Sequence, residues 1–189
     1  VMVVNVQTGA LLARLGSASF FNTPGGGQVD SCLAPRSPGS TLKPFLYGLA
    51  MMRQQVYPTE VLLDDVLDYG LYAPGNFDGI FNGPVTATEA LRYSLNVPAV
   101  ALLDRVGVAD FHGFLRRAGL ATIDEPPAHY GLGLTPGNCE VTMESLARPI
   151  QPTVLSTCPR QGQIEAGQAP HRDLAVPERA APPPPPAPQ

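Results

Sequence analysis

The chain has 189 residues and a net charge of −4, is 44% apolar and only 15% charged, and contains 22 prolines, no tryptophan and a single lysine, Lys43. This length suits one domain with a sizeable core, and the scattered arginines argue against nucleic acid as a partner, because binding a polyanion relies on a basic stripe. No apolar run approaches the roughly 18 residues that a membrane-spanning helix needs.

The prolines divide the chain into two regions. Eleven of them lie between Pro24 and Pro136, and the other eleven lie between Pro149 and Pro188. The second region has no aromatic and few aliphatic residues, a composition that cannot repay the entropy of ordering. We therefore predict a domain over residues 1–147 and a proline-rich, disordered tail over residues 148–189.

The first half of the domain alternates short elements with long loops. Residues 1–6 and 10–15 are apolar stretches around a Gln-Thr-Gly turn and predict a β-hairpin. Residues 16–39 are rich in Gly, Ser, Asn and Pro and predict a long loop, after which a buried helix begins near Ser40. Residues 57–85 contain three prolines and predict an excursion without a long element, in which Asp64, Asp65 and Asp68 form a solvated acidic stretch.

Three short helices are predicted next. Thr86-Ala-Thr-Glu89 is a capping box that opens a helix through Arg92. Asn96 is suited to cap a second helix that runs to Gly107, and residues 110–117 predict a third. A turn at 136–138 and an undeveloped helix at 142–147 complete the domain.

The cysteines and histidines carry weak signals. Cys32, Cys139 and Cys158 have neither CxxC spacing nor a histidine at zinc-ligand distance, so we predict no metal site and no cofactor. A Cys32–Cys139 disulfide is conceivable, but buried or idle thiols are favoured. His112 and His129 lack a spaced carboxylate or cysteine partner and are interpreted as core or surface histidines.

Ser40-Thr-Leu-Lys43 carries the strongest chemical signal. A hydroxyl and an amine at positions i and i+3 lie on one face of a helix. Serine needs a base to become a nucleophile, and a lysine whose pKa is lowered by burial can be that base. The alternative, in which Ser40 merely caps the helix and Lys43 lies on the surface, stays open from the sequence alone.

Ser94-Leu-Asn96 is a weaker motif by itself. It falls in a predicted turn between two helices, where a hydroxyl and a carboxamide can both point into one cleft. The competing interpretation is an asparagine cap beside an incidental serine.

These residues resemble a known family. Arg36-Ser-Pro-Gly-Ser-Thr-Leu-Lys-Pro-Phe45 is similar to the active-site serine segment of class A penicillin-binding proteins, the cell-wall transpeptidases. Tyr72-Ala-Pro-Gly-Asn76, Gly83-Pro-Val85 and residues 90–100 resemble its second block, in the same order. The opening segment 3–9 and residues 130–147 also resemble the family, and the nearest subtype is the 1C kind.

The resemblance implies an α/β (α+β) fold shared with serine β-lactamases, with an antiparallel sheet and a helical subdomain. It implies that Ser40 attacks the peptidoglycan stem peptide between its last two D-alanines, with Lys43 as base, that Ser94 relays a proton to the leaving amine, and that Asn96 holds the stem's amide. Penicillins and other β-lactams would acylate Ser40. A membrane anchor and a glycosyltransferase domain are expected upstream, with the site in the periplasm, on the outer face of the inner membrane.

One part of the family pattern is absent from these 189 residues. The third motif, Lys-Thr-Gly or Lys-Ser-Gly on a cleft strand, should follow the second block, yet no lysine follows Lys43. We therefore expect the later strands to be missing, the sheet to be reduced to the opening hairpin, and the chemistry to be impaired. Two alternatives are a non-catalytic remnant of a disrupted reading frame and a relative that hydrolyses or senses penicillin.

Overall fold

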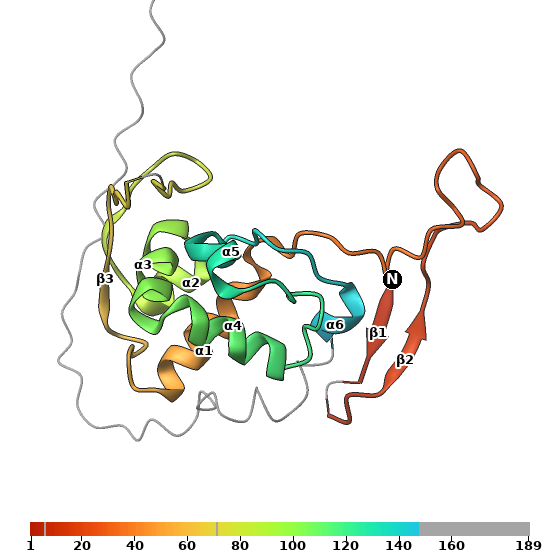
Figure 1. Ribbon diagram of the computed structural model, residues 1–189, viewed down its shortest axis with the longest axis horizontal. Coiled ribbons are helices and arrows are strands. Elements are labelled where there is room, and N and C mark those ends of the chain that lie inside the picture. The colour runs from red at the N-terminus through yellow and green to blue at the C-terminus, as the bar shows by residue number, and fades with distance from the viewer. Residues whose placement is uncertain (6, 71, 148–189) are drawn as a thin grey trace, which may run out of the picture. The chain divides into compact units, whose positions relative to one another are not determined.

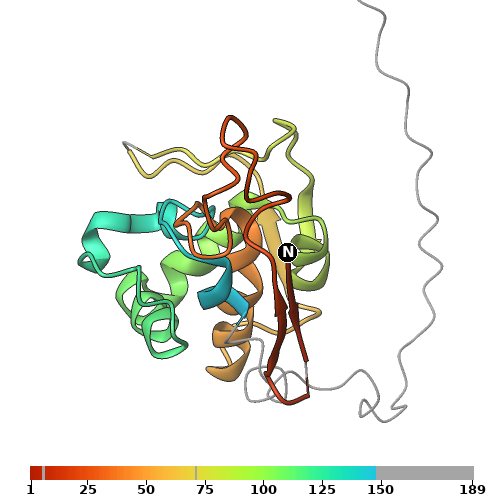
Figure 2. The same ribbon diagram turned by 90° about the vertical axis from the view of Figure 1, so that its right-hand side faces the viewer.

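A computed structural model describes residues 1–5, 7–70 and 72–147. Figures 1 and 2 show two views of the ribbon. Over these residues the elements are, in chain order, β1 (Met2–Val4), β2 (Leu11–Arg14), η1 (Gly39–Leu42), α1 (Lys43–Met52), β3 (Val61–Asp64), β4 (Gly83–Thr86), α2 (Ala87–Arg92), α3 (Asn96–Val106), α4 (Val108–Arg117), α5 (Pro127–Tyr130), η2 (Gly131–Leu134) and α6 (Met143–Ala147). The predicted tail, residues 148–189, lies outside the described residues.

The core lies among helices α1 to α4, which pack together in Figure 1. Helix α1 buries Leu46, Leu49 and Ala50, a spacing that places three side chains on one helical stripe. Helix α3 contacts α1 and buries residues over most of its length, so it is the central helix of the cluster. Gly107 joins α3 to α4 with a φ of 92°, a conformation that side chains other than glycine rarely adopt.

The predicted hairpin is confirmed by strands β1 and β2. Strand β1 pairs antiparallel with β2, with Met2 opposite Arg14. All four residues of β2 are exposed, so this ribbon buries little apolar surface of its own. An isolated two-stranded ribbon is marginal in water, and contacts outside the hairpin must therefore help to hold it.

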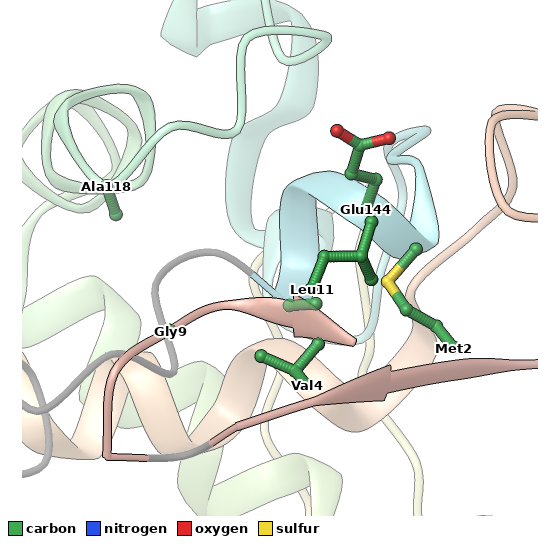
Figure 3. Close-up of a pocket in the computed structure, with 7 residues that line it drawn as sticks. Met2, Val4, Gly9, Leu11, Ala118 and Glu144 are labelled. Atoms are coloured by element: carbon green, nitrogen blue, oxygen red, sulfur yellow. The ribbon is translucent and has the colours of Figure 1, made fainter. Parts of the chain in front are cut away.

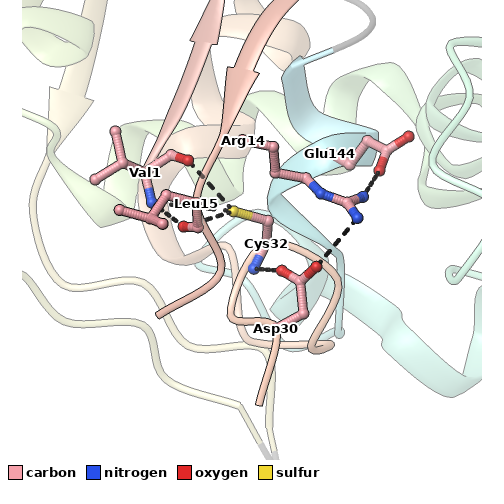
Figure 4. Close-up of polar contacts among 6 residues, drawn as sticks. All are labelled: Val1, Arg14, Leu15, Asp30, Cys32 and Glu144. Atoms are coloured by element: carbon pink, nitrogen blue, oxygen red, sulfur yellow. Dashed lines mark hydrogen bonds and ion pairs between the residues drawn. The ribbon is translucent and has the colours of Figure 1, made fainter. Parts of the chain in front are cut away.

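Two side chains, Arg14 and Cys32, anchor the hairpin through polar contacts (Figure 4). The guanidinium of Arg14 lies 3.3 Å from a carboxylate oxygen of Asp30 and 3.2 Å from one of Glu144, so it links β2 to a loop and to α6. The thiol of Cys32 lies 3.6 Å from the carbonyl oxygens of both Val1 and Leu15. These contacts tie both ends of the hairpin to segments that are distant in the sequence.

The expectation that the sheet is reduced to the opening hairpin is wrong in one respect. Strand β3 lies within the excursion of residues 57–85 and β4 ends one residue beyond it, and the two form a second antiparallel pair with Val61 opposite Thr86. Strand β3 alternates exposed and buried residues and places Leu62 and Asp64 on its inner face. In the described residues the strands thus form two separate two-stranded sheets.

The helix predictions are confirmed with small shifts. The capping box is present, and α2 runs from Ala87 to Arg92 as predicted. The predicted helix at 110–117 begins two residues earlier, at Val108. The helix predicted near Ser40 begins as the 3-10 turn η1 and becomes α-helical at Lys43. None of the helices that the structure describes has the length and apolar character needed to cross a membrane.

A pocket of about 420 Å³ opens beside the hairpin (Figure 3). Its lining comes from β1 and β2, from α6 and from the end of α4, and it includes Val4, Leu11 and Glu144. None of the predicted catalytic residues lines it, so this pocket is separate from the candidate active site.

Candidate active site

Ser40 lies in the 3-10 turn η1, directly before α1. Its carbonyl accepts a hydrogen bond from the N–H of Lys43, and residues three apart in such a turn lie one above the other. Ser40 is exposed, and its hydroxyl makes no hydrogen bond to another described residue. Neither η1 nor α1 has a side-chain cap, so the interpretation of Ser40 as a plain helix cap is wrong.

Lys43 is buried, with only 1% of its surface exposed. Its Nζ donates hydrogen bonds to the Ser94 carbonyl at 2.5 Å, to the Asn96 Oδ1 at 2.7 Å and to the Ser94 Oγ at 3.3 Å. The interpretation of Lys43 as a surface residue is therefore wrong. Its three donors face three acceptors on the Ser94–Asn96 turn, and the amine makes no hydrogen bond to Ser40.

Burial lowers the pKa of Lys43 from 10.5 to about 8. A charged amine loses hydration when it is buried, which favours the neutral form. The neighbouring acceptors are all uncharged, so no carboxylate at the amine opposes this effect. At neutral pH the amine is mostly protonated, but about a tenth of it is neutral and able to accept a proton.

The Ser94–Asn96 turn connects α2 to α3, as predicted. Ser94 has a φ of 56°, in the left-handed region that non-glycine residues seldom occupy. This conformation lets both its carbonyl and its hydroxyl face Lys43. Non-glycine residues in this region are often found at functional sites, where the surrounding structure holds them.

Asn96 does not cap α3, contrary to the sequence expectation. The cap position belongs to Leu95, and Asn96 is the first residue of the helix. Its side chain instead bridges two segments: Oδ1 accepts from Lys43 at 2.7 Å, and Nδ2 donates to the Gly75 carbonyl at 2.8 Å. The structure therefore brings Lys43, Ser94 and Asn96 together, with Ser40 one turn before the lysine.

The sequence analysis missed the role of Asp64. It was expected to be solvated with Asp65 and Asp68, which are indeed exposed, but Asp64 is 0% exposed. The signal that could have found it is the alternation of β3, because a period of two places Asp64 on the same face as Leu62. Its carboxylate accepts hydrogen bonds from Asn76 and Asn82.

Gly137 packs closely against Gly39, which the sequence analysis did not predict. A Cβ at this position would lie 2.4 Å from the backbone nitrogen of Gly39, so only glycine fits beside η1. The Gly137 carbonyl also accepts a hydrogen bond from the Ser37 hydroxyl at 2.7 Å. The predicted turn at 136–138 thus packs on the loop that carries Ser40.

The remaining candidates lie apart from these contacts. His112 is 8% exposed and stacks on Tyr130, while His129 is exposed and meets the same ring edge-on. Cys32 and Cys139 are both free thiols, so they do not form the disulfide that the sequence left open. Among the described residues, no cluster of three or more histidines, cysteines and carboxylates could hold a metal ion.

The model of the penicillin-binding protein transpeptidase domain matches residues 1–142 of the chain. The chain belongs to this family. Penicillin-binding protein 1C of Escherichia coli K12 is 40% identical over 133 residues, an alignment that covers 70% of this chain and 17% of the relative. This similarity fits the predicted nearness to the 1C kind.

Solved structures of penicillin-binding proteins share the fold of this transpeptidase domain. Penicillin-binding protein 1A from Haemophilus influenzae superposes with a TM-score of 0.65 at 23% identity, over 78% of this chain and 22% of that one. The PonA1 protein from Mycobacterium tuberculosis, solved in complex with penicillin V, superposes with a TM-score of 0.64 at 19% identity, over 76% of this chain and 40% of that one. The mixed α/β architecture predicted from the sequence is thereby confirmed.

Proposed function

We propose that the chain carries the acylation machinery of a serine D-alanyl-D-alanine transpeptidase of peptidoglycan crosslinking. The observation that carries this proposal is the position of Lys43. Its buried amine bonds to both Ser94 and Asn96, one turn after an exposed serine at the start of a helix. Membership of the penicillin-binding transpeptidase family supports it.

In the proposed reaction, the Ser40 Oγ attacks the carbonyl carbon between the last two D-alanines of a stem peptide. The neutral Lys43 amine accepts the hydroxyl proton, and the Ser94 hydroxyl relays a proton to the departing amine of the terminal D-alanine. An ester forms on Ser40 as the peptide bond breaks and free D-alanine leaves. An amine of a neighbouring stem then attacks the ester, which forms the crosslink and returns the proton to Ser40.

Two donors in the structure suit the substrate. The backbone N–H of Ser40 has no acceptor among the described residues, so it is available to an oxyanion at the turn's N-terminal side. The carboxamide of Asn96 uses one of its two N–H groups on Gly75, and the other remains for the stem's amide. Lys43 donates a hydrogen bond to the oxygen of that carboxamide.

Penicillin is the proposed inhibitor and the practical probe. Its strained amide takes the place of the D-alanyl-D-alanine bond, so Ser40 would open the ring and keep the acyl group. The complex of the PonA1 protein with penicillin V supports this ligand class through the shared fold.

We also propose an extracytoplasmic site of action, on the periplasmic face of the inner membrane, because the stem peptides lie there.

The isolated 189 residues are proposed to acylate slowly. They span only 17% of the length of the Escherichia coli relative and contain no lysine after Lys43, so they lack a Lys-Thr-Gly or Lys-Ser-Gly motif. The matching cleft strand would supply an oxyanion donor, and losing one such donor reduces the rate by about 100-fold to 1,000-fold. Substrate positioning by the same strand would be lost as well.

A labelled-penicillin experiment tests both parts of the proposal. The second-order rate of labelling is measured for this chain, for its Ser40→Ala variant and for the full-length Escherichia coli penicillin-binding protein 1C. We expect labelling that requires Ser40 and is at least about 100-fold slower than that of the full-length relative. Equal rates would refute the impairment, and undiminished labelling of the Ser40→Ala variant would refute the nucleophile.

The same measurement separates the alternatives. A complete absence of labelling in a folded chain would favour the non-catalytic remnant. Release of hydrolysed penicillin over many turnovers would favour a penicillin-hydrolysing relative.

A further inference from the structure

Asp64 is a buried carboxylate without a cationic partner in the described part of the chain. It is 0% exposed and accepts four hydrogen bonds, all from amide groups. Asn76 Nδ2 contacts both of its oxygens, at 2.8 and 2.9 Å, while Asn82 donates through its backbone at 2.9 Å and its side chain at 2.8 Å. Burying an unpaired charge is expensive, and such an arrangement invites a functional explanation.

The carboxylate fixes the orientation of Asn76. An ionised carboxylate only accepts hydrogen bonds, so Asn76 must turn its NH₂ group toward Asp64. The same NH₂ group also donates to the Ile80 carbonyl at 2.8 Å. The carboxamide oxygen of Asn76 therefore points the other way, where it accepts the backbone N–H of Asn96 at 2.8 Å.

Asn96 is thus held at its backbone and at its side chain by two adjacent residues. Asn76 binds its N–H, and the Gly75 carbonyl accepts from its Nδ2 at 2.8 Å. The side-chain oxygen of Asn96 accepts a hydrogen bond from Lys43 Nζ at 2.7 Å. A continuous chain of hydrogen bonds therefore runs from Asp64 through Asn76 and Asn96 to Lys43.

We infer that Asp64 and Asn76 are positioning residues for the catalytic lysine. They hold the start of α3 so that the Asn96 carboxamide oxygen meets Lys43, and they thereby fix where the amine lies relative to Ser40. This inference rests on the proposed function for its catalytic meaning, but its structural content concerns the environment of Lys43. It can therefore be tested by a property of Lys43 that does not require penicillin.

The single lysine of the chain makes such a test direct. Lysine labelled with ¹³C at Cε gives one resonance, and its titration between pH 6 and 11 reports the pKa of Lys43. In Asp64→Asn, the group that turns the Asn76 NH₂ toward it is changed, so Asn76 no longer has a fixed orientation. A less well placed Asn96 oxygen stabilises the ammonium form of Lys43 less, so we expect the pKa of Lys43 to fall by at least about half a unit, a threefold change in the protonation constant.

Asn76→Ala should lower the same pKa, because Asn96 loses the contact that orients it. Asp65→Asn is the matched control, since Asp65 is exposed and, among the described residues, its side chain bonds only to the adjacent Val66 N–H. This control should leave the titration unchanged. A role confined to folding would lower the unfolding temperature of the Asp64 and Asn76 variants without moving the Lys43 titration in the folded protein.

Other titrating groups do not obscure this measurement. Tyr47 lies one turn along α1, and burial together with the charge of Asp64 raises its pKa well above the usual range, so it stays neutral through the titration. His112 on α4 is buried against Tyr130. The other charged side chains on the helices that pack on α1 are exposed, and they are Glu89, Arg92, Asp104, Arg105, Asp110, Arg116 and Arg117.

The outcomes are separable from those of the proposed function. A lowered pKa of Lys43 in Asp64→Asn and in Asn76→Ala, with no change in Asp65→Asn, supports the positioning role whether or not penicillin labels Ser40. An unchanged or raised pKa in the folded variants overturns it. If one variant does not fold, the other decides the result, and the pH profile of penicillin labelling should move with the lysine titration.

Discussion

Lys43 is the residue on which the proposed chemistry of this transpeptidase domain depends. Its amine is buried, bonded to three uncharged acceptors and shifted to a pKa of about 8. A base must be neutral to accept the Ser40 proton. The neutral fraction of the amine rises with pH and levels off once the pH exceeds the pKa. The residue thus combines a protonated resting state with ready access to the reactive form.

The rate of penicillin acylation should therefore rise with pH and level off above about pH 8. Between pH 6 and pH 8 the neutral fraction of an amine with this pKa grows about 50-fold, and the rate should grow in proportion. Labelling reactions stopped at fixed times over pH 6 to 9, and corrected for hydrolysis of free penicillin, measure this profile. A flat profile would exclude Lys43 as the base.

Lys43→Arg should lower the rate of acylation by about 100-fold to 10,000-fold, because a guanidinium does not deprotonate. The same labelling reactions measure this loss.

At the scale of elements, the candidate active site is assembled by contacts between short segments rather than within one helix. The 3-10 turn η1 (Gly39–Leu42) supplies Ser40, the start of α1 supplies Lys43, and the turn before α3 supplies the acceptors. The segment around residue 137 supports η1 from outside the helical cluster. The positions of Ser40, Lys43 and Asn96 relative to one another therefore depend on the turns and loops that carry them.

Gly137→Ala should disturb the loop that carries Ser40. The added Cβ would collide with Gly39, and the φ of 97° at position 137 disfavours alanine in any case. We expect a loss of at least about 1 kcal/mol in the free energy of unfolding and slower acylation of Ser40. Gly48→Ala is the matched control, since its Cβ would meet nothing within 4 Å inside α1.

Chemical denaturation and penicillin labelling check this prediction. The control should be neutral or stabilising, because alanine favours a helix interior over glycine. An unaffected Gly137→Ala variant would show that the close approach to Gly39 has no influence on the site.

Local signals predicted part of the elements. The hairpin, the capping box of Thr86 and the bounds of α2 followed from sequence alone, because each depends on neighbouring residues. The pairing of β3 with β4 did not, because the two strands are separated by a long loop and pair through backbone groups that carry no residue signature. Asn96 was misjudged as a cap because its preference for that position competes with tertiary contacts to Lys43 and Gly75.

At the scale of the whole molecule, the family followed from two motifs, but their assembly did not. The sequence placed Ser40 and Lys43 on one turn and could not show that the amine would face Ser94 and Asn96. The burial of Asp64 was also beyond a local interpretation, since a run of acidic residues usually marks solvent exposure. These features depend on which segments meet in three dimensions.

The central claim, that Ser40 is the nucleophile of this domain, is tested most directly by locating the penicillin adduct. After prolonged incubation with penicillin V, trypsin digestion yields the peptide from Ser37 to Arg53, since Pro44 blocks cleavage after Lys43. Fragment masses should place one penicillin on Ser40 and none on Ser37 or Thr41, and Ser40→Ala should carry no adduct. An adduct on another residue, or one that persists in the Ser40→Ala variant, would contradict the account.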